Sequence, residues 1–379
     1  MKNKIAVLGG SFLQADFVEA ALARQLAVYV LDGNKNCHIS SWESVAFNHL
    51  DFSNLDLLNT FCRKNQINFI YAPSNELGNK VAAKMAGLFK YRYNSPEVVE
   101  ITLNKSLQRI VSNSCNLLNR PKSILYNDNI DEIESKIPYP MVIKPTSSSA
   151  GRGVTGVTNR YEFFQAVQTA KEFTRQSGDV VVEEFLPGDQ ISVETVSAEG
   201  QHYIVGITLE TIGPPPLFIE RCHHMNSDIH DFFYPKVFDV VQELLSQIGI
   251  QYGPCHIEMK VYQNKVSLVE IASRSGGLRD RLMKMAGYPD YNNLILDCYL
   301  NGKVDQECLY RPTRHGLVNI LTKCEDLLSV GLGQKDNTFH SVYFNGKEPV
   351  NNPQNIIDAY GYAYFFGNNP LRKYALEGC

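Results

Sequence analysis

Two glutamates carry the spacing that most directly suggests chemistry. The segments 256–261 and 266–271 read as the arms of a hairpin joined by a three-residue loop, 263–265. In that register Glu258 lies directly opposite Glu270 on one face, where like charges repel unless a cation lies between them. Mg²⁺ binds a few carboxylates together with phosphate oxygens. A two-residue loop would send the two side chains to opposite faces, and a surface hairpin with two solvated acids is the alternative interpretation.

A serine- and glycine-rich loop follows a strand that ends in a lysine. Lys144 ends the apolar strand 141–144, and the loop after it contains Ser148, Ser149, Gly151, Arg152 and Gly153. Small residues let backbone amides approach a phosphate closely, and the lysine adds a positive charge. No Gly-Lys-Ser/Thr follows, so this is not a Walker loop. A flexible surface loop is the alternative.

A third feature is a strand, 180–185, that runs into a Pro-Gly turn. The segment 181–188 reads Val-Val-Glu-Glu-Phe-Leu-Pro-Gly. Backbone groups at the strand end could hydrogen-bond an adenine edge, while Phe185 and Leu186 offer an apolar wall. The alternative is an ordinary strand end that carries two solvated glutamates.

The segment 272–277, Ala-Ser-Arg-Ser-Gly-Gly, directly follows the hairpin. Its Arg274 supplies a cation, and the glycine pair lets the backbone close on an anion. Arg279 and Arg281 come next and could hold a substrate carboxylate through bidentate contacts, although exposed arginines paired with acids fit the pattern equally well. The nine histidines show no metal-binding spacing such as HExxH.

The elements that must position these residues change character along the chain. The first 95 residues alternate predicted strands at 5–8, 28–32 and 67–71 with helices at 15–25 and 55–64. Such alternation predicts a parallel sheet with right-handed crossovers. Its first turn, 9–11, lacks the third glycine of a dinucleotide fingerprint, which argues against nicotinamide binding.

The remaining chain predicts a mixed arrangement of strands and helices. A single helix is expected over 97–114, another over 161–175, and antiparallel strands with intervening helices from about 190 to 305. We expect an α/β protein with α+β character in its middle. It divides into an N-terminal Rossmann-like domain at 1–95, a central domain at 96–305, and a mixed C-terminal region at 306–379.

Composition excludes several classes of protein. The chain has 36 basic and 40 acidic side chains, a formal net charge of −4, so it is not a general nucleic-acid binder. No apolar run approaches the roughly 18 residues of a membrane span, and a secretory signal is not expected. The nine scattered cysteines are an odd number without a CxxC pair, which predicts reduced thiols in a cytoplasmic protein.

The order of the motifs resembles the ATP-grasp superfamily, and within it the carboxylate–amine ligases. A lysine on a helix precedes Val-Ile-Lys-Pro with its loop, then Glu-Glu-Phe-Leu-Pro-Gly, His-x-Glu and Glu-Ile-Ala-x-Arg-x-Gly-Gly. The resemblance covers residues 1 to about 305. It implies that 1–95 is the domain that precedes the grasp fold and that 96–305 is the ATP-grasp domain itself, with a mobile lid subdomain at about 122–188.

The resemblance also implies roles for individual residues. Lys105 and Lys144 would contact nucleotide phosphates, and Glu258 and Glu270 would hold Mg²⁺ or Mn²⁺. Arg274, with Lys144, would neutralise the phosphoryl group during transfer. The loop that would cover the phosphates consists of Ser148, Ser149, Gly151, Arg152 and Gly153. The strand end that would flank the adenine consists of Glu183, Glu184, Phe185 and Leu186. The residues that would contact the substrate are Glu220, His223, Gly276, Gly277 and Arg281.

The sequence departs from the family pattern at two positions. Gln190 stands where the family often has an acid that contacts the ribose, so Asp189 or Glu194 is the alternative ribose contact. Ala272 stands where many members have an asparagine as a third metal ligand, although relatives with alanine exist.

The expected function is therefore ligation of a small-molecule carboxylate to an amine, with ATP and Mg²⁺, through an acyl phosphate and with release of ADP and phosphate. Neither nucleic acid nor membrane is an expected partner, and the last 70 or so residues would cap the active site or mediate a homodimer. Two alternatives stay open: an ATP-dependent carboxylase of the purine-synthesis type, and a nucleotide-binding module without turnover. A nicotinamide oxidoreductase is the least supported.

Overall fold

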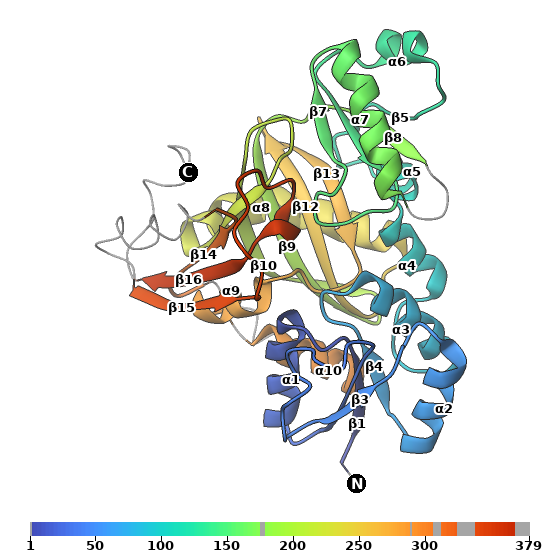
Figure 1. Ribbon diagram of the computed structural model, residues 1–379, viewed down its shortest axis with the longest axis vertical. Coiled ribbons are helices and arrows are strands. Elements are labelled where there is room, and N and C mark those ends of the chain that lie inside the picture. The colour runs from blue at the N-terminus through green and yellow to red at the C-terminus, as the bar shows by residue number, and fades with distance from the viewer. Residues whose placement is uncertain (1, 175–178, 289, 306–311, 324–337, 368–379) are drawn as a thin grey trace.

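A computed structural model describes residues 2–174, 179–288, 290–305, 312–323 and 338–367. Within them the strands form three sheets, which stand one above another in Figure 1. The mixed α/β fold class expected from the sequence is confirmed. No helix of the described part is long and apolar enough to cross a membrane.

The N-terminal sheet is parallel, as predicted, with strand order β3-β2-β1-β4. Its strands are β1 (Lys4–Leu8), β2 (Ala27–Asp32), β3 (Ala46–His49) and β4 (Phe69–Tyr71), and its helices are α1 (Phe12–Ala23), α2 (Leu55–Asn65) and α3 (Glu76–Phe89). Neither β3 nor α3 was among the predicted elements. The edge strand β3 has no buried residue, so its sequence lacks the apolar pattern of a core strand.

The single helix predicted over 97–114 is wrong, because the chain forms two helices. They are α4 (Pro96–Leu103) and α5 (Lys105–Ser114). Asn104 between them has an extended backbone, and its side chain accepts hydrogen bonds from the amides of Ser106 at 2.9 Å and Leu107 at 3.3 Å. Asparagine at a cap satisfies amides that a helix start leaves unpaired, so it ends one helix and begins the next. Lys105 thereby becomes the first residue of α5.

The second sheet is small, antiparallel and ordered β5-β8-β6-β7. Its strands are β5 (Ser123–Leu125), β6 (Met141–Pro145), β7 (Thr155–Val157) and β8 (Val180–Glu184), and its helices are α6 (Ile130–Lys136) and α7 (Arg160–Phe173). It has a hydrophobic core of its own, built from both helices and the sheet. Figure 1 shows this unit at the end of the molecule opposite the N-terminal sheet. The serine- and glycine-rich loop joins β6 to β7.

The third sheet has eight antiparallel strands in the order β13-β12-β9-β10-β11-β14-β16-β15. They are β9 (Asp189–Ala198), β10 (Gln201–Ile212), β11 (Glu220–Met225), β12 (Gly253–Tyr262), β13 (Lys265–Ala272), β14 (His315–Leu321), β15 (Thr338–Phe344) and β16 (Gly361–Gly367). The helices of this region are α8 (Ser227–Ile248), α9 (Arg279–Met285) and α10 (Tyr291–Asn301). The last three strands, β14, β16 and β15, extend the sheet beyond β11. The described part of the C-terminal region therefore belongs to the same sheet as β9 to β13.

The β12–β13 hairpin places the two glutamates opposite each other by a route that differs from the predicted one. The three-residue loop is wrong: Tyr262 pairs with Lys265 across a two-residue turn. The turn residues have φ of 48° and 63°, as expected for a tight hairpin. A bulge then leaves Val269 unpaired, and beyond it Glu258 pairs with Glu270. The extra residue cancels the one-residue shift of the shorter turn, so the facing pair is confirmed.

Candidate active site

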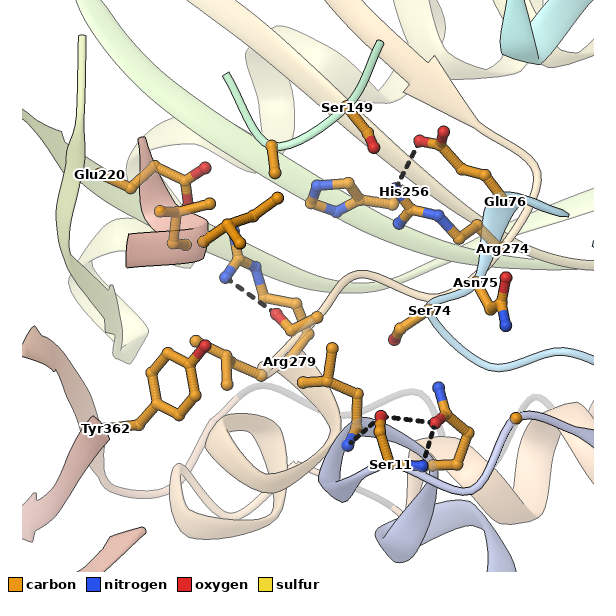
Figure 2. A pocket seen from close by; sticks show the side chains of 18 of the residues that line it. Ser11, Ser74, Asn75, Glu76, Ser149, Glu220, His256, Arg274, Arg279 and Tyr362 are labelled. Atoms are coloured by element: carbon orange, nitrogen blue, oxygen red, sulfur yellow. Dashed lines mark hydrogen bonds and ion pairs between the residues drawn. The ribbon is translucent and has the colours of Figure 1, made fainter. Parts of the chain in front are cut away.

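A pocket of about 450 Å³ lies where the N-terminal domain meets the eight-stranded sheet (Figure 2). Gly9 and Ser11 follow β1, Asp32 ends β2, and Ser74 to Leu77 follow β4, so the pocket opens at the carboxyl ends of the parallel strands. This edge is where open α/β sheets bind ligands. The opposite wall is made by β11, β12, the segment after β13 and the small-residue loop of the second sheet.

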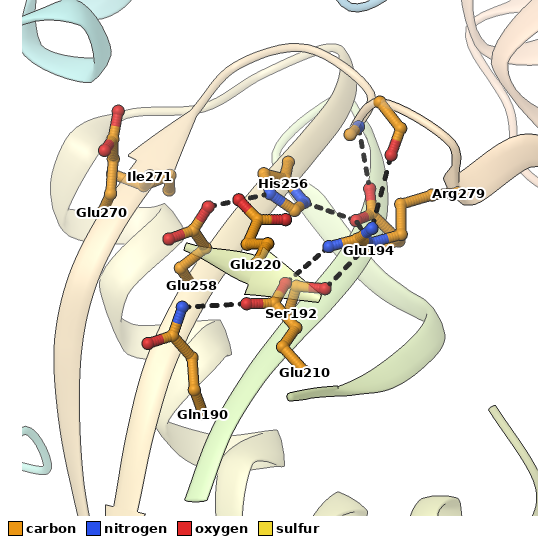
Figure 3. A network of polar contacts seen from close by, with 12 residues as sticks. Gln190, Ser192, Glu194, Glu210, Glu220, His256, Glu258, Glu270, Ile271 and Arg279 are labelled. Atoms are coloured by element: carbon orange, nitrogen blue, oxygen red, sulfur yellow. Dashed lines mark hydrogen bonds and ion pairs between the residues drawn. The ribbon is translucent and has the colours of Figure 1, made fainter. Parts of the chain in front are cut away.

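A buried chain of ionised groups leads to Glu258 (Figure 3). His256 Nδ1 lies 2.5 Å from Glu194 Oε1, and its Nε2 lies 3.4 Å from Glu258 Oε1. Burial alone would lower the pKa of His256, but the charge of Glu194 and the two hydrogen bonds raise that pKa to about 10. Burial would likewise raise the pKa of Glu258, yet the hydrogen bond from His256 and its charge hold that pKa at about 2. Glu258 is therefore ionised at neutral pH.

Lys105 connects the second glutamate to the small-residue loop. Its Nζ lies 2.9 Å from Glu270 Oε2 and donates to the carbonyl oxygen of Ser148 at 2.7 Å. The pKa of Glu270 is raised, first by burial and then by the charge of Glu258, with Lys105 opposing the shift. The charge of Glu258 thus disfavours the charge of Glu270. The oxygens of both acids are the hard donors that a divalent cation prefers.

A second ionic cluster lies next to Lys105. Glu183, 1% exposed, accepts hydrogen bonds from Arg109 Nε at 2.5 Å and Nη2 at 3.0 Å and from Lys144 Nζ at 2.7 Å. Burial alone would raise the pKa of Glu183, but the two cations hold that pKa at about 2. Arg109 also donates to the carbonyl oxygen of the bulge residue Val269 at 2.8 Å. One arginine therefore ties the second sheet to the hairpin that carries the facing acids.

The part of the chain that carries these charged residues matches a known protein family. Residues 137–280 match the sequence model of the ATP-grasp domain. This part of the chain is an ATP-grasp domain. The match runs from β6 through the loop, β8 and the β12–β13 hairpin to Asp280, and thus contains Lys144, Glu183, Glu258 and Glu270.

Individual proteins similar to this chain include two kinds of enzyme. A formate-dependent phosphoribosylglycinamide formyltransferase of Wigglesworthia glossinidia brevipalpis is 29% identical over 49% of this chain and 48% of its own length. An alanine–anticapsin ligase of Bacillus subtilis is 25% identical over 61% of this chain and 53% of its own. The matches thus span about half the length of these curated relatives.

The fold similarity extends over nearly the whole chain. The crystal structure of an L-amino acid ligase from Bacillus licheniformis superposes with a TM-score of 0.81 at 19% identity, over 97% of this chain and 94% of that one. The coverage includes the N-terminal sheet and the C-terminal strands as well as the ATP-grasp domain.

The loop of the ATP-grasp domain is held by the Arg152 side chain, by a backbone hydrogen bond from Val154 to Gly151, and by Lys105. Arg152 Nε donates to the carbonyl oxygen of Ser149 at 3.1 Å, and Gly151 and Gly153 have φ of 69° and 72°. A side chain at Gly153 would also meet Phe173 at 3.0 Å. The Ser148 hydroxyl is buried and has no hydrogen-bond partner among the described residues, so it is a donor without a protein acceptor.

The structure brings together most, but not all, of the predicted substrate residues. Among all the site residues predicted from the sequence, those that line the pocket are Ser149, Glu220, His223, Glu258, Arg274 and Gly277. The amide of Gly276 donates to Glu194 at 3.2 Å. Arg281 lies outside the lining described for this pocket: it pairs with Asp16 at 3.0 Å and its guanidinium lies 4.7 Å from the ring centroid of Phe12.

Predicted ribose and adenine contacts are partly engaged with other protein groups. Gln190 Nε2 donates to Glu210 Oε2 at 2.9 Å, and Glu194 is bound to His256. Phe185, at the end of β8, stacks with Phe218 at a centroid distance of 6.1 Å. Glu184 and Leu186 are half-buried beside it. The apolar wall expected at this strand end is therefore formed by two aromatic rings, one of them from a distant loop.

Two charged residues shape the site in ways that sequence reasoning did not predict. Arg279 is only 2% exposed and binds Glu210 at 2.5 Å, Ser192 at 3.1 Å and the ring of His223. Glu76, from the N-terminal domain, lies 3.3 Å from Arg274 Nη2. The helical spacing of Lys105 and Arg109 was a signal for Arg109, whereas nothing local in the sequence links Glu76 to a residue 198 positions away.

Glu220 gives the ligand-free protein a testable pH dependence. Burial, and next the charge of Glu258, raise its pKa from 4.5 to about 7. Because the folded state holds this proton more tightly than the unfolded chain, the contribution of Glu220 to stability is full below pH 4.5 and is lost as pH rises through 7. We expect Glu220→Gln to flatten the fall in melting temperature between pH 5 and 8, measured by calorimetry without nucleotide or metal. An unchanged slope in the variant would contradict the raised pKa.

Proposed function

We propose that this protein is an ATP- and Mg²⁺-dependent ligase that joins a small carboxylate to an amine and releases ADP and phosphate. The observation that carries the proposal is the facing pair Glu258 and Glu270 beside Lys105. Glu258 lines the pocket, which also contains Arg274. The ATP-grasp domain match and the similar ligases support it. The free, mostly buried cysteines of the described residues fit the cytoplasmic location that we also propose.

The residues present fit a divalent cation. Glu258 and Glu270 would hold it through carboxylate oxygens, and it would neutralise charge on the triphosphate. Two other groups of the described residues, Glu210–Glu220–His223 and Glu210–His256–Glu258, place their ligand atoms within 4.8 Å of one another. Since Glu210 is already bonded to Arg279 and His256 is held as a cation by Glu194, we assign the ion to the hairpin pair.

The nucleotide would lie between the second sheet and the hairpin. Lys105 and Lys144 would contact its phosphates, and the loop 148–153 would close over them, with the buried Ser148 hydroxyl available as a donor. Glu184, Phe185 and Leu186 would flank the adenine. Glu183 would orient Lys144 rather than touch the base, because its carboxylate is used by Lys144 and Arg109.

The chemistry needs positioning and charge neutralisation more than acid–base groups. A carboxylate oxygen of the substrate attacks the γ-phosphorus of ATP, the bond between that phosphorus and the β,γ-bridging oxygen breaks, and ADP leaves. The amine nitrogen then attacks the acyl carbon, phosphate leaves, and the amine proton goes to phosphate. Arg274 would neutralise the transferred phosphoryl group, with Lys144, and the loop would exclude water that hydrolyses the acyl phosphate.

The proposal is tested by product analysis with purified protein. ADP and phosphate release should require ATP, Mg²⁺, a carboxylate and an amine together, and mass spectrometry should show a product that has lost one water relative to its two substrates. Pools of amino acids serve as first substrates. Release of AMP and pyrophosphate, or ATP turnover that ignores both substrates, would overturn the proposal.

A purine-type reaction is the second candidate, since one relative is a phosphoribosylglycinamide formyltransferase. Such a substrate carries a phosphate and needs unpaired cations in the pocket. The cations described in its lining, Arg274, Arg279 and His256, lie beside Glu76, Glu210 and Glu194 respectively. ADP release that depends on bicarbonate or formate and a phosphoribosyl amine would favour this candidate, and ATP binding without any turnover would favour a binding module.

A further inference from the structure

The pocket has an apolar wall in addition to its charged groups. The wall is built from distant parts of the chain and consists of Leu13, Leu278, Ile356, Ile357 and Tyr362. Phosphoryl transfer requires cations and hydrogen-bond donors, so it does not explain these side chains. Apolar surface exposed to water is unfavourable by about 25 cal/mol per Å² until an apolar group covers it.

Two isoleucines of this apolar wall lie on a short, firmly held turn. Ile356 and Ile357 belong to the 3₁₀ helix η2 (Ile356–Asp358), which lies between β15 and β16. The side chain of Asn355 accepts from the amide of Ile357 at 3.0 Å, and the carboxylate of Asp358 accepts from the amide of Gln354 at 2.6 Å. Ile357 is nevertheless 41% exposed. The turn thus presents an exposed aliphatic side chain from a backbone held by its own hydrogen bonds.

An aromatic stack connects the turn to the N-terminal domain. Tyr362, on β16, stacks with Tyr343 at 6.4 Å and an interplanar angle of 4°, and Tyr343 stacks with Phe12 at 3.6 Å and 9°. Phe12 precedes Leu13, the wall residue of α1. Figure 2 shows Tyr362 on the side of the pocket away from Glu76 and Arg274. Tyr362, one residue of the apolar wall, therefore lies apart from the Glu76–Arg274 pair.

The backbone at Leu278 supports a functional reason for the wall. Its φ of 66° lies in the left-handed region, which leucine rarely adopts. Such conformations cost on the order of 1–3 kcal/mol and are concentrated at ligand sites. Leu278, which directly follows Gly277, adopts this strained conformation and lines the pocket.

We propose that the turn Ile356–Asp358 determines substrate specificity, by packing against an aliphatic side chain carried by the carboxylate or by the amine substrate. This inference rests on the proposed ligase function and names the substrate class: small amino acids with aliphatic rather than polar side chains. The C-terminal strands then have a role in the active site. β14 pairs with β11, β16 pairs with β14, and the turn that precedes β16 lines the pocket.

The experiment compares L-leucine with L-asparagine, which have nearly the same shape and opposite polarity. Each is offered once as the carboxylate and once as the amine, with the second substrate drawn from a common pool, and ADP release is measured. We expect kcat/KM to favour leucine by about 100-fold in one of the two roles, the scale of apolar discrimination in enzyme pockets. Ile357→Asp should remove most of that preference without changing the KM for ATP.

Leu88→Asp is the matched control, because Leu88 is 62% exposed on α3 and lies outside the described lining. It should keep the preference for leucine. Calorimetric binding of leucine and asparagine to the whole protein with ADP provides a readout that needs no turnover. Selective binding of leucine that Ile357→Asp abolishes supports the wall even if the ligase reaction fails. Equal use of both amino acids, no binding of either, or equal losses in both variants overturns it.

Discussion

Glu270→Gln is expected to reduce ATP-dependent ligation about 1000-fold while the protein stays folded. The substitution keeps the shape of the side chain but removes one of the two charges that face each other on the hairpin. A bound cation supplies several kcal/mol of transition-state stabilisation, and each 1.36 kcal/mol is a factor of ten in rate. The measurement is initial ADP release at saturating ATP, repeated over a range of Mg²⁺ concentrations, with melting temperature as the check on folding.

The matched control for this variant is Glu172→Gln, which removes the same charge from the exposed surface of α7. It should keep full activity and the same dependence on Mg²⁺. A Glu270→Gln protein with wild-type activity would remove the basis for the proposed cation site. If activity were lost but the Mg²⁺ dependence of ATP binding were unchanged, Glu270 would act only through Lys105, its partner at 2.9 Å.

Glu183→Gln is expected to lower the free energy of unfolding by about 3–5 kcal/mol, the cost of removing one member of a buried ion pair. Two cations, Arg109 and Lys144, would then be buried without their counter-charge. The measurement is denaturant unfolding followed by a probe in the second sheet. Glu184→Gln, the next residue on the same strand and half-buried, should change stability by less than about 0.5 kcal/mol.

A triple variant separates stability from function in this cluster. Replacing Arg109, Glu183 and Lys144 together with apolar residues of similar volume should recover much of the lost stability, because no buried charge is left unpaired. It should not recover ATP binding, because Lys144, one of the two proposed phosphate contacts, is gone. An equally large loss of stability from Glu184→Gln would show that the effect belongs to the strand and not to the cluster.

In the β12–β13 hairpin the pairing of the two glutamates was predicted correctly, although the predicted turn was wrong. Apolar alternation placed both arms correctly, and the expected opposition of Glu258 and Glu270 holds. The turn is one residue shorter than predicted, and the bulge at Val269 compensates for it. A bulge has no strong local signature. Here its free carbonyl is bonded by Arg109, 160 positions earlier in the chain, which is a tertiary contact.

Glu183 and Arg281 show where residue type was insufficient. The family resemblance placed Glu183 at the adenine. Arg281 was a candidate for a substrate carboxylate because of its bidentate donors, with an arginine paired with acids as the alternative. In the fold, Glu183 is enclosed by Arg109 and Lys144, while Arg281 lies against Asp16 and Phe12. The partners come from α5, β6 and α1, so the decision depended on how these elements pack.

By itself the sequence determined most of the alternating strands and helices of the first 95 residues, the parallel start followed by antiparallel pairing, and the series of motifs that resembles ATP-grasp ligases. These properties depend on residue type and on spacing over a few residues, so they can be read locally. The tertiary structure alone decided that Glu76 meets Arg274, that Arg279 is buried among acids, and that an isoleucine turn reaches the pocket from the C-terminal strands. Such contacts join residues tens to hundreds of positions apart, and their geometry exists only once the sheets have packed.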